Sequence, residues 1–204
     1  MDAIERLQRR FRARWVGVKF YRGKLPCSEV VALPNGRFCE AITQAHTRPA
    51  LVTRDNLHCP GACHVFGWDD TVQTEMVDKL HQDEGFSLPV AQKLVQNLPT
   101  IHGSLTGIGL NVAEIPDVLV SYLQPGQVMS LLRGYQLTFG KDLSAELSSI
   151  VSVCGHVTLQ SFHDQKIAMS FGCAYSRHYG GITRDRVAIG LPFKLAGDIL
   201  GDNE

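Results

Sequence analysis

The chain has 204 residues, of which 44% are hydrophobic and 20% charged, a composition typical of a folded globular protein and not of a disordered one. Lys+Arg and Asp+Glu both count 20, so no net charge points to nucleic acid or an anionic membrane as the main partner. No apolar run approaches the roughly 18 residues of a membrane-spanning helix, and the start is too charged for a signal peptide. We therefore expect a cytoplasmic protein that forms one domain over residues 1–204.

The first segment, about residues 2–14, predicts a basic amphipathic helix. Ile4, Leu7 and Phe11 recur at helical spacing, which favours a helix that packs on the body of the protein. Its arginines would also suit an arm that binds a polyanion, although the apolar spacing favours the packed helix. These arginines are Arg6, Arg9, Arg10, Arg12 and Arg14.

The rest of the chain alternates between patterns of period two, typical of strands, and patterns of period 3.6, typical of helices. In chain order we predict a strand at 15–21, a helix at 37–47, a strand at 50–53, helices at 71–81 and 88–98, a strand at 115–123, a helix at 127–140, a short helix at 144–153, a hairpin of strands at 156–162 and 166–172, a strand at 187–192 and a helix at 193–200. Residues 56–67 and 100–111 resemble loops. Because helices and strands follow one another in no regular alternation, we predict an α+β fold with a mixed or mostly antiparallel sheet covered by helices.

The cysteines are the most informative residues of this chain. A cysteine that only fills core space usually lies inside an apolar run, whereas five of the six lie at the edges of such runs. Edges and loops are where a scaffold presents ligands and nucleophiles. These five are Cys39, Cys59, Cys63, Cys154 and Cys173. In a reducing cytosol they would stay as thiols unless they bind metal or take part in catalysis.

The spacing of these cysteines leaves several kinds of site open. Cys59 and Cys63 are close enough to bind one ion, but a structural zinc site usually needs a second clustered pair, which the sequence lacks. Iron–sulfur clusters accept four thiolates from dispersed positions, which the fold would have to bring together. Gly155 and Gly172 adjoin two of the cysteines and would let a bulky cofactor approach the backbone. Free buried cysteines are the alternative.

Several motifs resemble the ArCR-type family of uncharacterised archaeal and bacterial proteins. The resemblance lies in WVGVKF, RFCEA, CPGACHVFG, IPDVLVSYLQPGQVMSLLRGY, VCGHV, SFGCAYSRHYG and VAIGLPF, and it spans nearly the whole chain. It implies that Cys39, Cys59, Cys154 and Cys173 are the family's cysteines, whereas Cys63 and Cys27 are left open. It implies no reaction.

Together these observations predict a metal-binding protein in which Cys39, Cys59, Cys154 and Cys173 hold an iron–sulfur cluster, with [4Fe–4S] favoured and Cys63 as an alternative metal ligand. Its role would be electron transfer or other redox chemistry, and the sequence does not decide whether it is an enzyme. The expected partner is a redox protein or a small-molecule substrate. We expect no binding to nucleic acid or membrane, and the protein could form a homo-oligomer.

Two alternatives stay open beside the cluster. The first is a cofactor-free thiol enzyme in which Cys59 is the nucleophile, Cys63 resolves it, and Arg177 or His178 binds an anionic substrate. The second is a module that binds a small molecule or a partner and whose thiols are incidental. Its pocket would involve Gln127, Arg133, Tyr135 and Gln136.

Overall fold

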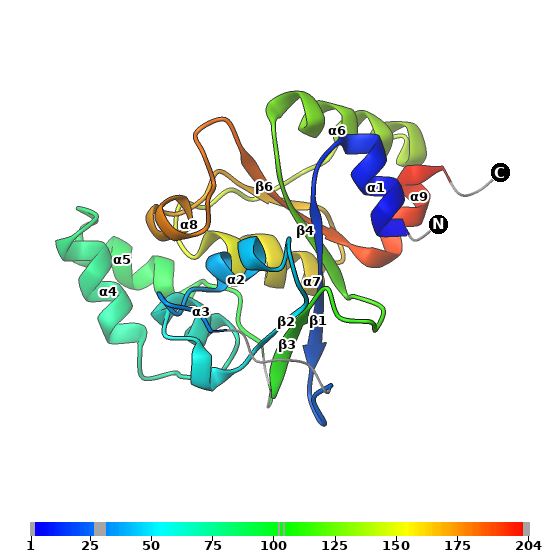
Figure 1. Cartoon of the computed structure of the whole chain (residues 1–204). Helices are drawn as coiled ribbons and strands as arrows, with labels where there is room; N and C mark the ends of the chain where they lie inside the picture. The colour runs from blue at the N-terminus through cyan, green and yellow to red at the C-terminus, as the bar shows by residue number, and fades with distance from the viewer. Residues whose placement is uncertain (1–2, 27–31, 102, 104, 202–204) are drawn as a thin grey trace.

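The computed structural model describes residues 3–26, 32–101, 103 and 105–201 (Figure 1). Its strands form one sheet in the order β2-β3-β1-β4-β6-β5, and every pairing described is antiparallel. Helices cover the sheet, so the α+β prediction is confirmed. The strands are β1 Trp15–Tyr21, β2 Ala50–Val52, β3 Gly107–Leu110, β4 Val118–Leu123, β5 Ala168–Ser170 and β6 Val187–Pro192.

Helices lie on both faces of this sheet (Figure 1). One face is covered by α1 Ala3–Phe11, α6 Pro125–Phe139 and α9 Phe193–Leu200. The remaining helical elements are α2 Phe38–Gln44, η1 Arg54–Asn56, α3 Pro60–Val65, α4 Gln73–Gln82, α5 Leu88–Gln96, the π-helix η2 Ser152–Leu159, α7 Gln160–Asp164 and α8 Ala174–Tyr179. Most of these gather on the opposite face, which carries the larger hydrophobic core.

The central strand β4 shows how the two cores are divided. Successive side chains of a strand point to opposite faces, and accordingly Val118 and Val120 join the larger core while Leu119 and Leu123 join the smaller one. β4 is buried along its whole length, and its first three residues, Val118, Leu119 and Val120, form a continuous apolar run. This explains why the strand was recognisable from the sequence.

The N-terminal helix α1 packs on the smaller core. Leu7 and Phe11 are buried, and the Arg10 guanidinium donates a hydrogen bond of 3.0 Å to the Ile199 carbonyl in α9. The basic segment is therefore attached to the body of the protein. Among the described residues, no helix is long and apolar enough to cross a membrane.

Residues 107–110 form strand β3, so the prediction of a loop there is wrong. The strand pairs with both β1 and β2 and is fully buried. Gly107 and Gly109 hide it in the sequence, because they lack side chains that would show an alternating pattern. A Cβ on Gly109 would lie only 2.8 Å from Val112 and 3.0 Å from Tyr21, so close packing requires glycine here.

The region before and after Cys154 also differs from the prediction. Neither the short helix at 144–153 nor the strand at 156–162 forms, because the chain is irregular up to Val151 and then winds into η2 and α7. η2 lies directly on β6, where a Cβ on Gly190 would overlap the Val157 carbonyl. Only β5 of the predicted hairpin is present, and its partner is β6.

Two further short α-helices, α3 and α8, are missing from the prediction. Residues 60–65, which we expected within a loop, form α3, whose first residue is Pro60. Proline suits the first helical position because its nitrogen has no hydrogen to leave unbonded. The second helix, α8, follows Cys173 directly.

Candidate functional site

Four of the five predicted cysteines line one cavity on the helical face that carries the larger core. Each belongs to a different segment: Cys39 is the second residue of α2, Cys59 precedes α3, Cys154 is the third residue of η2, and Cys173 precedes α8. The cavity is small, with a volume of about 70 Å³. Tertiary structure thus brings together residues that are up to 134 positions apart in the chain (173 − 39).

A left-handed glycine positions Cys59. Gly36 has φ +58°, and its carbonyl accepts hydrogen bonds from the backbone N–H groups of His58 (2.9 Å) and Cys59 (3.0 Å). A Cβ on Gly36 would lie 2.9 Å from the His58 nitrogen, so both the conformation and the close approach require glycine. Pro60 then begins α3, and both Pro60 and Gly61 line the cavity beside Cys59.

Cys154 is presented by a rare backbone geometry. π-Helices occur mostly as short segments and often at functional sites. Here the segment follows Val151, a β-branched residue at φ +45°, a region such residues seldom adopt. Val151 lines the cavity and packs on Gly61 and Gly155, where added Cβ atoms would lie 3.0 and 3.1 Å from it.

The two glycines beside the cysteines therefore have another explanation than the one we expected. Gly155 makes room for Val151, and Gly172 has φ +91° and packs on Ser176. Close packing and backbone conformation account for both glycines, so neither requires a nearby cofactor to explain it.

Cys173 caps α8 in a reciprocal arrangement with Ser176. The Cys173 sulfur accepts the Ser176 N–H at 3.4 Å, and the Ser176 hydroxyl accepts the Cys173 N–H at 2.8 Å. At the other end of α8, Gly180 packs against Cys39, since an added Cβ would lie 2.7 Å from the Cys39 Cβ. The helix thereby holds two of the four cysteines in place.

The thiols of the cavity influence one another electrostatically. The pKa of Cys39 is raised to about 12. Burial is the largest cause, and the neighbouring thiols of Cys173 and Cys59 contribute to it. Burial, followed by Cys59, Cys173 and Cys39, also raises the pKa of Cys154 well above the usual range. These two sulfurs are consequently neutral thiols at neutral pH unless a cation replaces their protons.

One guanidinium lies beside the sulfurs. Burial alone would lower the pKa of Arg37, but its electrostatic interaction and hydrogen bond with Cys59 raise it. The guanidinium carbon also lies 4.6 and 5.5 Å from the ring centroids of Tyr175 and Tyr179. Both rings come from α8, and stacking on them orients the cation toward the cavity that it lines.

The other walls of the cavity are mostly apolar, with Lys79 and Glu84 as further charged members. The apolar side chains come from α2, α4 and the segment around η2, and they include Phe38, Met76, Leu80, Ile150, Val151 and Val153. Sulfurs in such surroundings are shielded from most hydrogen-bond donors.

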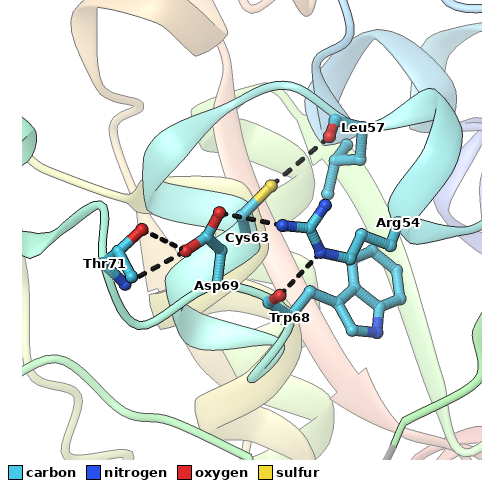
Figure 2. Close-up of polar contacts among 6 residues, drawn as sticks. All are labelled: Arg54, Leu57, Cys63, Trp68, Asp69 and Thr71. Atoms are coloured by element: carbon cyan, nitrogen blue, oxygen red, sulfur yellow. Dashed lines mark hydrogen bonds and ion pairs between the residues drawn. The ribbon is translucent and has the colours of Figure 1, made fainter.

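Cys63 is placed differently from the other four. It is buried in α3, and its thiol donates a 3.4 Å hydrogen bond to the Leu57 carbonyl, beside the Arg54–Asp69 ion pair (Figure 2). Burial raises its pKa to about 11, and Cys59 adds to that effect. Cys63 thus neighbours Cys59 but is not among the described residues that line the cavity. Cys27 lies outside the described residues.

The residues predicted for the alternative sites are dispersed. His178 is exposed and packs edge-on against Tyr179, while Arg177 donates to the Phe171 and Thr183 carbonyls. Gln127 bonds the end of α1, and Gln136 bonds Asp142. Tyr135 lines a different cavity, and the other residues predicted for that site, Gln127, Arg133 and Gln136, are not among the described residues that line it. Arg133 is exposed.

No three His, Cys, Asp or Glu side chains in the described part of the chain are grouped closely enough to hold one metal ion.

Sequence reasoning missed Arg37, Tyr175 and Tyr179 as parts of the site. The spacing of the two tyrosines, four residues apart, was the one available signal, because it places both rings on one helical face. Arg37 was not recognisable, since only the fold brings it to α8.

A family model described as uncharacterised ArCR, DUF169, matches residues 8–202. No curated protein matches the chain. No solved structure matches it either.

Proposed function

The chain belongs to the DUF169 family of uncharacterised ArCR proteins, and we propose that it is an iron–sulfur protein with an electron-transfer role. The observation that carries this proposal is the meeting of Cys39, Cys59, Cys154 and Cys173 in one cavity. Four cysteine thiolates are the usual ligands of [2Fe–2S] and [4Fe–4S] clusters, and we favour [4Fe–4S].

The arrangement of the sulfurs supports a cluster over a single ion. In a [4Fe–4S] cluster each cysteine binds a different iron atom, so its four sulfurs surround the inorganic core. A tetrahedral zinc site instead brings its ligands to one point, at about 2.3 Å from the metal. The four cysteines line one cavity from four separate segments, so a cluster in that cavity would be bound from several sides.

The size and the charge of the cavity also support this proposal. Its volume of about 70 Å³ is far below the roughly 300–1,000 Å³ of pockets that hold organic ligands, which favours a compact inorganic group. A cluster with four thiolates is negatively charged, and Arg37 beside Cys59 would offset part of that charge. Such a cluster would supply one-electron transfer when bound.

The residues around the cavity would control the environment of the cluster. Apolar side chains such as Phe38 and Val153 would limit access of water to the cluster. The Ser176 N–H, which already contacts the Cys173 sulfur, would stabilise that sulfur as a thiolate. With four cysteines as ligands no iron would stay open to a substrate, which favours electron transfer over substrate chemistry at iron.

The test is anaerobic purification followed by iron and sulfide analysis and visible spectroscopy. We expect about four iron and four sulfide per chain, with a broad visible absorbance that bleaches on reduction. Single replacements of Cys39, Cys59, Cys154 and Cys173 by serine should each lower the iron content strongly. Cys63→Ser is the matched control, because Cys63 is buried beside the site but does not line the cavity, and it should retain the cluster.

Two results would contradict the proposal. One is a protein that contains stoichiometric zinc and takes up no iron during anaerobic reconstitution. The other is an unchanged iron content in all four cavity variants.

The contact between Arg37 and Cys59 favours one second candidate, a thiol enzyme with Cys59 as its nucleophile. Cys59 is partly exposed and lies beside the Arg37 guanidinium, so a reagent or substrate could reach its sulfur. Alkylation with iodoacetamide at mildly acidic pH separates the two candidates. Selective labelling of Cys59 in the protein as isolated favours the enzyme. The cluster is favoured if all four cysteines are protected from labelling and a chelator abolishes that protection.

A further inference from the structure

A second cavity, of about 380 Å³, lies where the link between α1 and β1 meets the end of α2 and the segment between α8 and β6. Its lining is positively charged and rich in hydrogen-bonding groups, and no Asp or Glu is among the described residues that form it. The polar lining includes Arg12, Arg14, Arg186, Thr43, His46 and Tyr122.

Two polar atoms in this lining make no hydrogen bond of normal geometry within the described structure, although Thr43 lies beside one of them. They are the Tyr122 hydroxyl and Nε2 of His46, and both atoms are buried. Tyr122 is only 8% exposed, so its hydroxyl cannot rely on bulk water. Since a buried polar group without a hydrogen bond is costly and uncommon in folded proteins, these atoms point to a ligand in the cavity.

Arg12 occupies a position that normally favours glycine. It follows α1 directly and has φ +48°, while the Ala13 N–H bonds the Gln8 carbonyl at 3.3 Å, which is the pattern of a Schellman helix end. In that motif the left-handed residue is usually glycine, because a side chain is strained there. The presence of arginine at this position accords with a role for its guanidinium in the cavity.

The other arginines approach from different segments. Arg186 is held by a 3.0 Å hydrogen bond from its guanidinium to the Tyr122 carbonyl. Arg14 begins the approach to β1, and its positive charge, after burial, contributes to a lowered pKa of His46. One carboxylate, Asp185, accepts a hydrogen bond from Thr183 of the lining and interacts electrostatically with Arg186, but Asp185 is not itself part of the lining.

We propose that this cavity binds a small anion that carries a phosphate group. Guanidinium groups match the geometry of phosphate oxygens, and the hydroxyl of Tyr122 offers a further donor. The volume is near the lower end of the range for small-molecule sites, which suits phosphate with a small organic group or phosphate alone. None of the residues that line this cavity also lines the cysteine cavity, although the two cavities are neighbours through the contact of Gly180 with Cys39.

The direct test is calorimetric titration of the full chain with inorganic phosphate and with phenyl phosphate, at constant ionic strength set by chloride. Saturable binding of either probe is expected, and their relative affinities distinguish free phosphate from a phosphate monoester. Succinate is the competing anion. Tighter binding of succinate than of both phosphate probes, or no binding beyond the chloride control, would overturn the proposal.

Three variants locate the site. Arg12→Gly removes the charge at a position that suits glycine, so it should lower phosphate affinity about tenfold while the melting temperature stays equal or rises. Tyr122→Phe removes only the buried hydroxyl and should weaken binding without changing charge. Arg9→Ala is the matched control, because Arg9 is exposed on the same helix and does not line the cavity. Equal loss of affinity in Arg9→Ala and Arg12→Gly would refute the site.

Discussion

At the scale of single residues, the cysteines of the cavity differ mainly in their environment. Cys39 and Cys154 are buried, whereas Cys59 and Cys173 are partly exposed. Burial opposes ionisation of a thiol, and each neighbouring thiolate opposes it further. Cys39 lies in the first turn of α2, a position that favours a thiolate, but burial outweighs that effect and its pKa is raised to about 12. Metal binding to such thiols must release protons, so it becomes stronger as pH rises.

The raised thiol pKa values predict how the stability of the metal-free protein depends on pH. The pKa of Cys39 is raised to about 12 and that of Cys63 to about 11, both from 9.0. The folded state therefore binds these protons more tightly than the unfolded state. This contribution is fully present below pH 9.0 and is lost as the pH rises through the two folded values.

Urea unfolding of metal-free protein at pH 7.5, 9 and 10.5 measures this effect. The free energy of unfolding should fall over that series, and the fall should be smaller in the double variant Cys39→Ala, Cys63→Ala. An identical slope in the variant would show that other groups cause the loss.

Arg37 provides a second prediction at this scale. Replacing Arg37 with glutamine removes the positive charge beside Cys59, so alkylation of Cys59 in metal-free protein at pH 7 should slow by about three- to tenfold. Mass spectrometry of the labelled peptides measures the rate for each cysteine. Arg54→Gln is the control, since Arg54 lies near Cys63 and pairs with Asp69. It should leave the rate at Cys59 unchanged.

At the scale of elements, the site depends on how closely α8 approaches α2. Gly180 at the end of α8 and Cys39 in α2 are in direct contact, and Thr43 of α2 donates a 2.7 Å hydrogen bond to the Gly180 carbonyl. One methyl group at this contact would separate the two helices, because the atoms facing it include backbone.

Gly180→Ala should therefore destabilise the protein by about 1–3 kcal/mol and lower its iron content. The added Cβ would lie 2.7 Å from both the Cys39 Cβ and the Ser176 carbonyl oxygen. Gly126→Ala is the control, because Gly126 lies in α6 with no atom within 4 Å of an added Cβ. Thermal unfolding and iron analysis of both variants test the prediction, which fails if Gly180→Ala matches Gly126→Ala in both measurements.

The elements also differ in how readily the sequence predicts them. β1, β4, β6, α4, α5, α6 and α9 follow clear apolar patterns, and each was predicted within a few residues. The errors lie where tertiary contacts override local pattern. Val157 and Leu159 alternate as in a strand, yet both are buried in η2, because this segment packs on β6 at Gly190.

At the scale of the whole molecule, the proposed cluster would act on one face of the sheet. All four cysteines lie on the face with the larger core, while α1, α6 and α9 pack on the other. A group bound by four segments restricts the motion of all of them together. The opposite face has its own core and its own contacts.

Hydrogen exchange of the iron-loaded and metal-free proteins should show this division. Loading should slow exchange in α2, α3, η2 and α8 and leave α1, α6 and α9 largely unchanged, because only the first group carries the ligands or follows them directly. Mass spectrometry of peptic peptides resolves both groups. Equal slowing on both faces would mean that loading stabilises the whole fold instead of the site.

The sequence by itself determined the α+β class, most of the long elements and the four cysteines worth testing. The elements follow from local periodicity, and the edge positions of the thiols pointed to five cysteines, of which the family resemblance implied four. Only the tertiary structure decided that Cys39, Cys59, Cys154 and Cys173 share a cavity, that Cys63 bonds the Leu57 carbonyl instead, and that Arg37 joins them. The physical reason is that these contacts join four segments distant in the chain, and their packing depends on close approaches at glycines that no local pattern reveals.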